Sequence, residues 1–354
     1  MKRKIIALLL TMVLSAVALF GCGSEANYFT ELKETVKHIG NTTESTIKLK
    51  IPKEAFFAPN DMPVDVTNGL DVNLKLKTQA DEDGNGACVV DIMLNGQDEY
   101  ATLTTIVKEG NYLYVQTDSI ISFLKEMGLD PKGETEAQFK QLGIEKAAKV
   151  DIKQACKILD IEYDEDTFNL EKYKGEIGEY IDEMVDLVED DFKNLSSKEG
   201  DDYVLKLDKN NILKAGDDVC KFIDEDLKDA YDITYALVKE IAGEKTAKNF
   251  PKYKDVEKKA KDFKKEIQEN RKDAANKMGD CVIKSAVNSD EKKIDFGIEN
   301  LNMDGYDMTV VVDTKGSNED VDIKSLIPKD AVDITAILNQ MVSMAQSNGA
   351  NTIQ

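Results

Sequence analysis

Apolar and polar residues alternate with a period of two in two separate parts of the chain. In the first part Ile47, Leu49 and Ile51 alternate with polar neighbours, and in the second part Ile294 and Phe296 do the same. This period is that of a strand with one buried face. The pattern predicts two antiparallel meanders, with strands at 45–51, 70–77, 87–95, 99–108 and 112–116, and at 281–287, 293–301 and 306–313.

Between the two meanders, apolar residues recur at spacings of three and four, which is the period of an α-helix. Residues 118–278 are therefore predicted to be mostly helical, with one short strand at 203–207. A helix is also predicted over 29–39, where Gly40 would supply a left-handed C-terminal cap. A last helix is predicted after Pro328, with the apolar residues Val332, Ile337, Leu338 and Met341.

The order of these elements predicts an α+β fold. One curved, mostly antiparallel sheet, interrupted by the helical segment at about 118–278 and with helices packed on one face, explains the pattern more simply than two sheets. The predicted division is a signal peptide (1–21), a short tether (22–27), a single domain (28–346) and a flexible tail (347–354). Val-Asp-Ile-Lys occurs at Val150 and at Val321, but four residues are too few to indicate a duplication.

Two apolar rows would meet on the inner face of such a sheet. They are Leu70, Val72 and Leu74 in the first meander and Ile294, Phe296 and Ile298 in the second. Apolar rows in sheets are usually core, so a filled space between the rows and the helices is the default expectation. The alternative is an open cavity that would take an acyl chain or a lipid. A filled space would leave a protein that acts through its acidic surface on an envelope partner.

The N-terminal residues have the pattern of a secretory signal peptide. Lys2, Arg3 and Lys4 precede an apolar run over 5–18, which is shorter than the ~20 residues of a membrane-spanning helix. The run closes on Leu19-Phe20-Gly21-Cys22, which resembles the lipobox of bacterial lipoproteins. The resemblance implies cleavage after Gly21, a diacylglyceryl group on Cys22, and attachment to the extracytoplasmic face of the cell membrane. Two acyl chains give stable anchoring, where one gives marginal binding.

Beyond Cys22, the order of elements resembles that of the lipoprotein-carrier family that includes LolA and LppX-type proteins. That resemblance implies a strongly curved antiparallel sheet that half-wraps its helices and leaves an apolar cavity. It rests on the succession of meander, helical middle and meander.

The charge of the chain narrows the class of partner. The formal net charge is −22, and loss of Lys2, Arg3 and Lys4 with the signal peptide removes three positive charges and leaves −25. Such a surface is a poor partner for nucleic acid and for anionic lipid head groups. The predicted link to the membrane is therefore the covalent lipid on Cys22.

Motifs for catalysis are lacking. The single histidine, His38, is expected to be a surface cation in the last turn of the first helix, and there is no HExxH, no phosphate-binding loop and no CxxC. The sequence therefore predicts a non-catalytic binding protein without a cofactor. A hydrolase that uses a pair of acidic residues remains the alternative, because such a pair is defined by distance in the fold.

A calcium loop and disulfide bonds are both conceivable from the sequence, but each has a simpler alternative. Asp81, Asp83, Asn85 and Gly86 match the first half of a calcium loop, but the twelfth position is Ile92 instead of glutamate, so an ordinary hairpin turn is expected. The cysteines after Cys22 are read as small buried hydrophobic residues, with two disulfides as the alternative. They are Cys88, Cys156, Cys220 and Cys281.

The lysine-rich segment 252–278 carries a narrow apolar stripe that includes Tyr253, Phe263 and Ile267. The stripe would suit either a coiled coil with a partner or packing on the protein's own body. The second reading is favoured because the heptads are few. Its basic face is expected to pair with acidic residues of the same chain.

Overall fold

The structure is a computed structural model of the 354-residue chain. The signal peptide, Cys22, the tether and the tail lie outside the described residues, so the predictions for them remain predictions. The described residues are 28–55, 68–95, 97–126, 128–130, 132–158, 170–192, 195–303, 306–319, 321–340 and 342.

Twelve strands form one open sheet in the order β12-β6-β5-β4-β3-β2-β1-β11-β10-β9-β8-β7. All neighbouring pairs are antiparallel except β12 with β6. The strands are β1 (Thr42–Ile51), β2 (Leu70–Ala80), β3 (Gly86–Leu94), β4 (Ala101–Glu109), β5 (Tyr112–Gln116), β6 (Ala147–Asp151), β7 (Ser196–Glu199), β8 (Asp202–Leu207), β9 (Val282–Asn288), β10 (Lys293–Met303), β11 (Tyr306–Ser317) and β12 (Ala331–Asp333).

The two predicted meanders join in this one sheet because β1 pairs with β11. Ile47 of β1 lies opposite Val312 of β11, although 269 residues separate the neighbouring pair Ser45 and Thr314 along the chain. The α+β class and the single interrupted sheet are therefore confirmed.

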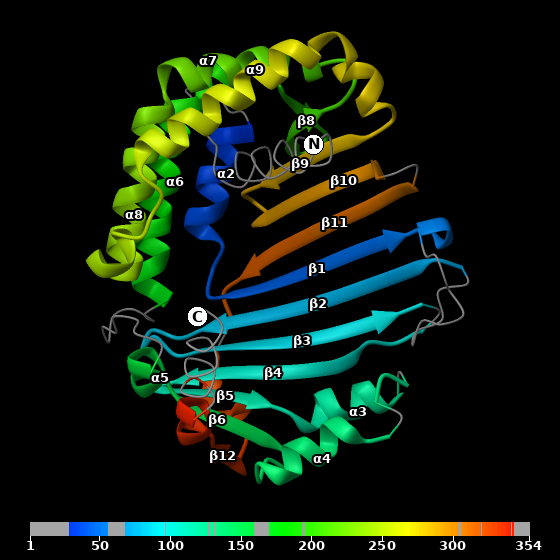
Figure 1. Ribbon diagram of the computed structural model, residues 1–354, viewed down its shortest axis with the longest axis vertical. Coiled ribbons are helices and arrows are strands. Elements are labelled where there is room, and N and C mark those ends of the chain that lie inside the picture. Colours follow the sequence, from blue (N-terminus) through cyan, green and yellow to red (C-terminus); the bar gives the residue numbers. More distant parts are fainter. Residues whose placement is uncertain are drawn as a thin grey trace, which may run out of the picture.

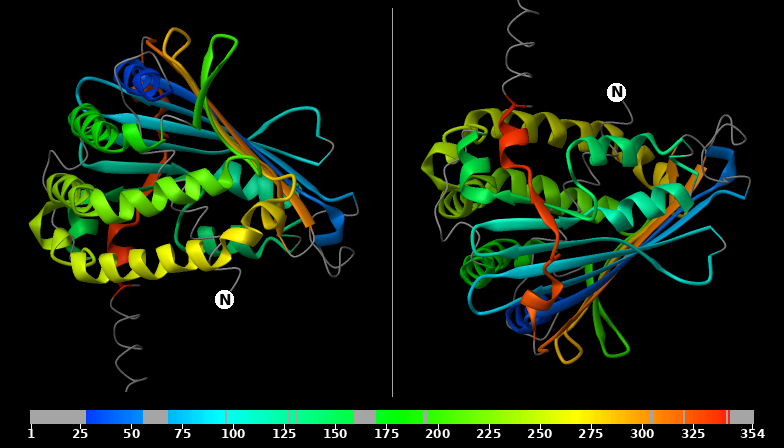
Figure 2. Two further views of the ribbon diagram at one scale, coloured as in Figure 1. Left: turned by 90° about the horizontal axis from the view of Figure 1, so that it is seen from above. Right: turned by 90° about the horizontal axis from the view of Figure 1, so that it is seen from below.

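Most of the helices lie between β5 and β9 in the sequence and gather on one side of the sheet (Figures 1 and 2). Figure 2 also shows that the strands turn relative to one another along the sheet, as the natural twist of β-strands requires. The helices are α2 (Tyr28–His38), η1 (Lys53–Ala55), α3 (Asp118–Glu126), α4 (Glu134–Gln141), α5 (Ile152–Ile158), α6 (Leu170–Phe192), α7 (Ile212–Glu225), α8 (Leu227–Ala247), α9 (Tyr253–Met278) and η5 (Ile323–Leu326).

The turn between α2 and β1 depends on glycine. Helix α2 ends at His38, and Gly40 follows with φ of 92°, a conformation that side chains disfavour. A Cβ atom on Gly40 would lie 2.1 Å from the carbonyl oxygen of Ser317, and one on Gly316 would lie 1.9 Å from the carbonyl oxygen of Ile39. The backbone of this turn therefore packs directly on the end of β11.

The largest core forms where α2 and α6 cover β8, β9 and β10. Phe29 and Val188 are fully buried there, and they pack against Val287 and Ile298 of the sheet. The side chain of Tyr28 is also fully buried, and its ring meets that of Phe29 edge to face at 5.2 Å. Helix α2 is thus the central element of this core.

Helix α9 packs on α7, which confirms the expectation that segment 252–278 lies on the protein's own body. Phe263 is 2% exposed, and Gly216 of α7 allows close approach, since a Cβ there would lie 3.2 Å from Ile267. Arg271 pairs with both carboxylate oxygens of Asp217, and Lys264 pairs with Asp224. The expected internal charge pairing is therefore present.

Besides strand β7 at 196–199, which pairs with β8 within the segment predicted to be mostly helical, two short segments differ from the expected helices. Residues 147–151 form strand β6, which pairs with β5, and Val332 lies in β12, which pairs with β6, before a helix at 335–340. Both segments are short and flanked by helical patterns, so the local sequence favours helix. The free edge of β5 offers backbone hydrogen bonds that override this preference.

Candidate binding face of the sheet

The two predicted apolar rows lie on the same face of the sheet. Leu74 of β2 lies opposite Ile47 of β1, and Ile47 lies opposite Val312 of β11. Val312 in turn lies opposite Phe296 of β10. Residues directly opposite each other in a sheet point to the same side, so this row runs unbroken from β2 to β10.

A second row runs parallel to the first. Val72 lies opposite Leu49, and Leu49 lies opposite Val310. Val310 lies opposite Ile298. Leu70 extends the apolar surface by one step, since it lies opposite Ile51. We call this side of the sheet the apolar face.

One end of the apolar face, over β8 to β10, is sealed by helices. Ile298 is 5% exposed and Val287 1% exposed beneath α2 and α6. Ile294 and Phe296 are partly buried and pack against the same core. Three of the six predicted residues therefore belong to a filled core.

The other three predicted residues lie near the opposite end. Val72 and Leu74 are partly buried against the cluster of Ile92, Leu94 and Phe123, in which Phe123 comes from α3. Leu70 is half-buried. Helix α3 thus covers the face over β3 and β4, as α2 covers it over β8 to β10.

The middle of the apolar face is covered less well. Ile47 and Leu49 of β1 and Val310 and Val312 of β11 are only half-buried, and none of them joins the described core clusters. We call these four residues the central strip. In Figure 1, β11, β1 and β2 lie between the large helices at one end of the molecule and α3, α4 and α5 at the other.

The sequence pattern includes the residues of the central strip but does not single them out. They alternate like any other half-buried strand residues. Their special position follows from the β1–β11 pairing, which brings chain segments more than 260 residues apart together. These four residues could be identified from the sequence only if the β1–β11 pairing were already known.

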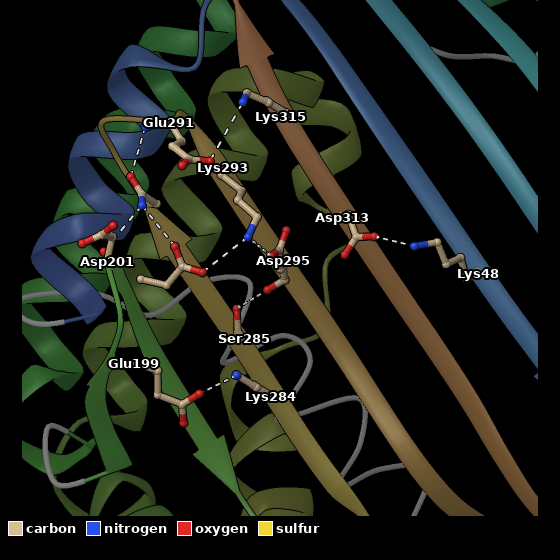
Figure 3. A network of polar contacts seen from close by, with 12 residues as sticks. Lys48, Glu199, Asp201, Lys284, Ser285, Glu291, Lys293, Asp295, Asp313 and Lys315 are labelled. Carbon is tan, nitrogen blue, oxygen red and sulfur yellow. Dashed lines mark hydrogen bonds and ion pairs between the residues drawn. The ribbon is translucent and has the colours of Figure 1, made fainter.

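Over β8 to β11 and β1 the opposite face of the sheet is charged (Figure 3), whereas over β3 and β4 it packs against η5 through Ala87, Val107 and Ile323. The ammonium nitrogen of Lys293 lies 2.6 Å from Asp295 and 3.4 Å from Asp202. Lys48 pairs with Asp313 at 3.1 Å, and the same face also carries the pair Lys284–Glu199. This pattern of alternating charge is typical of a solvated surface.

Asp202 and Asp295 are two acidic side chains that both pair with Lys293. Burial raises the pKa of Asp295, while Lys293 partly offsets this shift. The hydrogen bond from Asn288 lowers the pKa of Asp202, with a further contribution from Lys293. Since both carboxylates are held on one ammonium group, the arrangement matches a structural ion-pair network.

The Asp81 turn has its polar groups satisfied from within. The Asp81 carboxylate accepts hydrogen bonds from the backbone N–H groups of Asp83 (3.0 Å) and Asn85 (2.9 Å) and from the Asn85 side chain (3.0 Å). The Asn85 side-chain oxygen accepts from the N–H of Gly110. Gly84 adopts φ of 76°. The expectation of an ordinary hairpin turn is confirmed.

The cysteines and the histidine occupy structural positions. Cys156 and Cys281 are buried and Cys88 and Cys220 are half-buried, and all four are free thiols, so the disulfide alternative is wrong. Burial raises the pKa of each thiol. His38 is exposed in the last turn of α2, as expected.

The described part of the chain, within residues 28–342, offers neither a metal site nor a membrane-spanning helix. No group of three His, Cys, Asp or Glu side chains there is placed to hold a metal ion. No helix in that part combines the length and apolar character needed to cross a membrane.

Comparison with known proteins assigns no relative. No family model matches the sequence, and no curated protein or solved structure shows significant similarity to it. Function must therefore be argued from the residues and the geometry described above.

Proposed function

We propose that the protein is a lipid-anchored extracytoplasmic binding protein that holds an acyl chain on the central strip. The observation that carries the proposal is the half-buried state of Ile47, Leu49, Val310 and Val312, on a face that is otherwise sealed at both ends. A contiguous group of apolar side chains that stays partly exposed to solvent often marks a binding site for an apolar ligand.

The predicted anchor supports an apolar ligand from the membrane. The first described residue, Tyr28, lies six residues after Cys22, a span of about 20 Å when extended. Its backbone N–H donates to the Ser196 hydroxyl at 3.1 Å, and its ring is buried beside β9. The domain therefore starts on the apolar face, within a short tether of the lipid on Cys22, and lipid is the apolar ligand most abundant at that place.

The chemistry of this face supports the proposal of a non-catalytic role. Among the described side chains, the inward ones of β1, β2, β10 and β11 are aliphatic, aromatic or hydroxyl-bearing, and none is a carboxylate, an amine or an imidazole. Asp202 and Asp295, which share Lys293, lie on the charged face. Binding without turnover is thus what the residues support.

A binding titration with a matched pair of variants tests the ligand. Val310 and Val311 are adjacent half-buried valines of β11, but Val310 belongs to the apolar face and Val311, opposite Lys48, to the charged face. The mature protein, freed of bound lipid by organic extraction and refolded, should bind a fluorescent fatty-acid probe. Val310→Asp should weaken binding at least tenfold (~1.4 kcal/mol) because its carboxylate would enter the acyl site, and Val311→Asp should change it less than twofold.

The same titration can contradict the proposal. Wild-type protein that binds no acyl probe, while its circular dichroism and urea unfolding are those of a folded domain, would show that the central strip is not an acyl site. Equal losses in Val310→Asp and Val311→Asp would indicate that the aspartate acts on the fold instead of the site. The acidic surface would then be the better place to look for a partner.

The anchor is tested separately. Replacing Cys22 with alanine should leave uncut precursor and abolish acyl-lipid labelling in the native host, because the thiol is the atom that carries the lipid. Cys88→Ala is the matched control, since Cys88 lies in β3 and far from the predicted cleavage site. Normal processing and labelling of Cys22→Ala would contradict the lipoprotein assignment.

A further inference from the structure

The inward side chains of the central strands change from hydroxyl-bearing to apolar along their length. On β1 they are Thr43 and Ser45, followed by Ile47, Leu49 and Ile51. Because the strands are in register, the change falls at the same level on β11 and one inward position earlier on β2, where Leu76 lies opposite Ser45. On β2 it runs from Thr78 through Leu76 to Leu70, and on β11 from Thr314 through Val312 to Met308.

The hydroxyl groups at this end form two bonded pairs. The Ser45 and Thr314 hydroxyl oxygens lie 2.9 Å apart, and the hydroxyls of Thr43 and Thr78 are hydrogen-bonded to each other. Each hydroxyl offers one donor and two acceptor sites, so one bond within a pair leaves a donor and several acceptor sites unused. Thr43, Ser45 and Thr314 are only half-buried and Thr78 is exposed, so these sites remain open to another polar group.

The hydroxyl end is closed by backbone. The carbonyl oxygen of Ile39, just after α2, lies against Gly316 at the next inward position of β11. A ligand on the central strip therefore meets hydroxyls and then a carbonyl at this end. At the other end, near Ile51 and Met308, it meets apolar side chains.

The length of the strip suits one acyl chain. From Ser45 to Ile51 the strand advances about 20 Å at ~3.4 Å per residue. An acyl chain of one membrane leaflet spans about 15 Å, half of the ~30 Å hydrocarbon core. The remaining length lies at the hydroxyl end, where a small head group would fit.

We infer that the ligand is an uncharged acylglycerol-type lipid of the surrounding membrane, with its head group at the Ser45–Thr314 end and its acyl chain along the central strip. This deepens the proposed function and rests on it. No inward side chain on β1, β2, β10 or β11 carries a charge that would pair with a carboxylate, phosphate or ammonium head group. Hydroxyl and ester groups match the hydroxyls that are present, whereas a charged head group would lose hydration without a partner.

Competition between three probes with the same C16 chain tests the inference. The probes are monopalmitoylglycerol, palmitate at pH 8 and unsubstituted hexadecane. Wild-type protein should bind the glycerol ester about tenfold more tightly than palmitate. The variant Ser45→Ala/Thr314→Val should lose roughly threefold to tenfold in affinity for the glycerol ester, in keeping with one or two neutral hydrogen bonds. Its affinity for hexadecane should stay within twofold.

Thr46→Val is the matched control, because Thr46 is the neighbour of Ser45 but lies opposite Asp313, on the charged face. It should leave all three affinities within twofold. If the double variant keeps the preference for the glycerol ester, or if palmitate binds as tightly as the ester, the head-group assignment is wrong while acyl binding stands. If wild-type protein binds none of the probes, the proposed function and this inference fail together.

Chain direction gives a readout that does not depend on a variant. A monoacylglycerol with a nitroxide at the terminal carbon of its chain should broaden the methyl resonances of Ile51 and Met308 and spare that of Thr314. The reverse pattern would place the head group at the apolar end and overturn the inference.

Discussion

The apolar face contains two regions built from the same kind of residue but buried to different degrees. Over β8 to β10, Val287 is 1% exposed beneath α2 and α6, whereas Val310 on β11 is only half-buried. The two valines lie on one continuous face and differ in what covers them. An apolar row of this sheet is therefore fully buried only where a helix is held in place over it.

Polar contacts fasten that helix. The hydroxyls of Tyr28 and Ser285 lie 2.7 Å apart, and Glu31 accepts a hydrogen bond from the backbone N–H of Ser289 at 2.6 Å. The backbone N–H of Tyr28 donates to Ser196. These contacts hold α2 over β9 and β10, while no described helix is tied to β1 or β11 in the same way. The central strip is therefore left without a helix fastened over it in the described part of the chain.

The largest loss of stability is expected for a substitution in the core beneath α2. Phe29→Ala should lower the free energy of unfolding by about 3–5 kcal/mol, because it removes a fully buried ring from the core. Leu49→Ala, on the central strip, should cost less than half as much. Urea denaturation of both variants measures the difference, and equal losses would contradict the distinction between sealed and open regions.

A matched pair of smaller substitutions compares a valine buried beneath α2 with a valine of the central strip. Val287→Ala should destabilise the protein by roughly 2 kcal/mol, the transfer term for two methyl groups plus a cavity. Val310→Ala should cost under about 1 kcal/mol in lipid-free protein. Adding monopalmitoylglycerol should raise the stability of Val287→Ala and wild type alike, but that of Val310→Ala less, because the ligand then contacts fewer side-chain atoms. Identical costs in the absence of lipid would show that β11 is as well sealed as β9.

The fastening of α2 itself is tested with Tyr28→Phe. Ser285 donates its only proton to the carbonyl oxygen of Asp295 at 3.0 Å, so Tyr28 is the donor of the bond to Ser285. Loss of this buried bond should cost about 1 kcal/mol.

The same residue gives a pH signature. Burial raises the pKa of Tyr28 to about 12, although the bond to Ser285 lowers it slightly. The neutral phenol therefore stabilises the folded state fully below pH ~10, the unfolded value, and this contribution is lost as the pH rises from 10 towards 12. Wild type should lose stability relative to Tyr28→Phe between pH 8 and pH 11. A constant difference would mean that Tyr28 is not buried in solution.

The smallest effect is expected on the charged face, at Asp295. Burial raises the pKa of this carboxyl, and one of its oxygens is buried without a hydrogen-bond partner. A raised carboxyl pKa gives stability at low pH that is lost as the pH rises through the folded value. Asp295→Asn should therefore gain stability relative to wild type on going from pH 3 to pH 7. A relative loss over that range would mean that the pair with Lys293 dominates.

The sequence predicts the strands well and the coverage of the sheet poorly. Period-two runs such as 45–51 and 293–301 correspond to β1 and β10, because alternation directly reflects one buried face. Residues 147–151 and Val332 were assigned to helices, since their pairing with β5 and β6 depends on tertiary contacts.

The candidate site depended on contacts that no local pattern encodes. The rows with Val72 and Ile298 could be named from alternation alone. Which part of them stays open depends on where α2 docks, and the Tyr28–Ser285 contact that fixes it spans 257 residues. Likewise, the β1–β11 pairing that creates the central strip joins the two ends of the domain.

Native mass spectrometry of protein extracted from its own host shows whether the half-buried strip holds a membrane lipid. Wild-type protein should carry one non-covalent acyl lipid beyond the covalent group on Cys22, and organic extraction should release an uncharged acylglycerol. Val310→Asp should lack this additional mass, and Val311→Asp should retain it. Wild-type protein that carries only its covalent lipid, in a folded state and from intact membranes, would contradict the account.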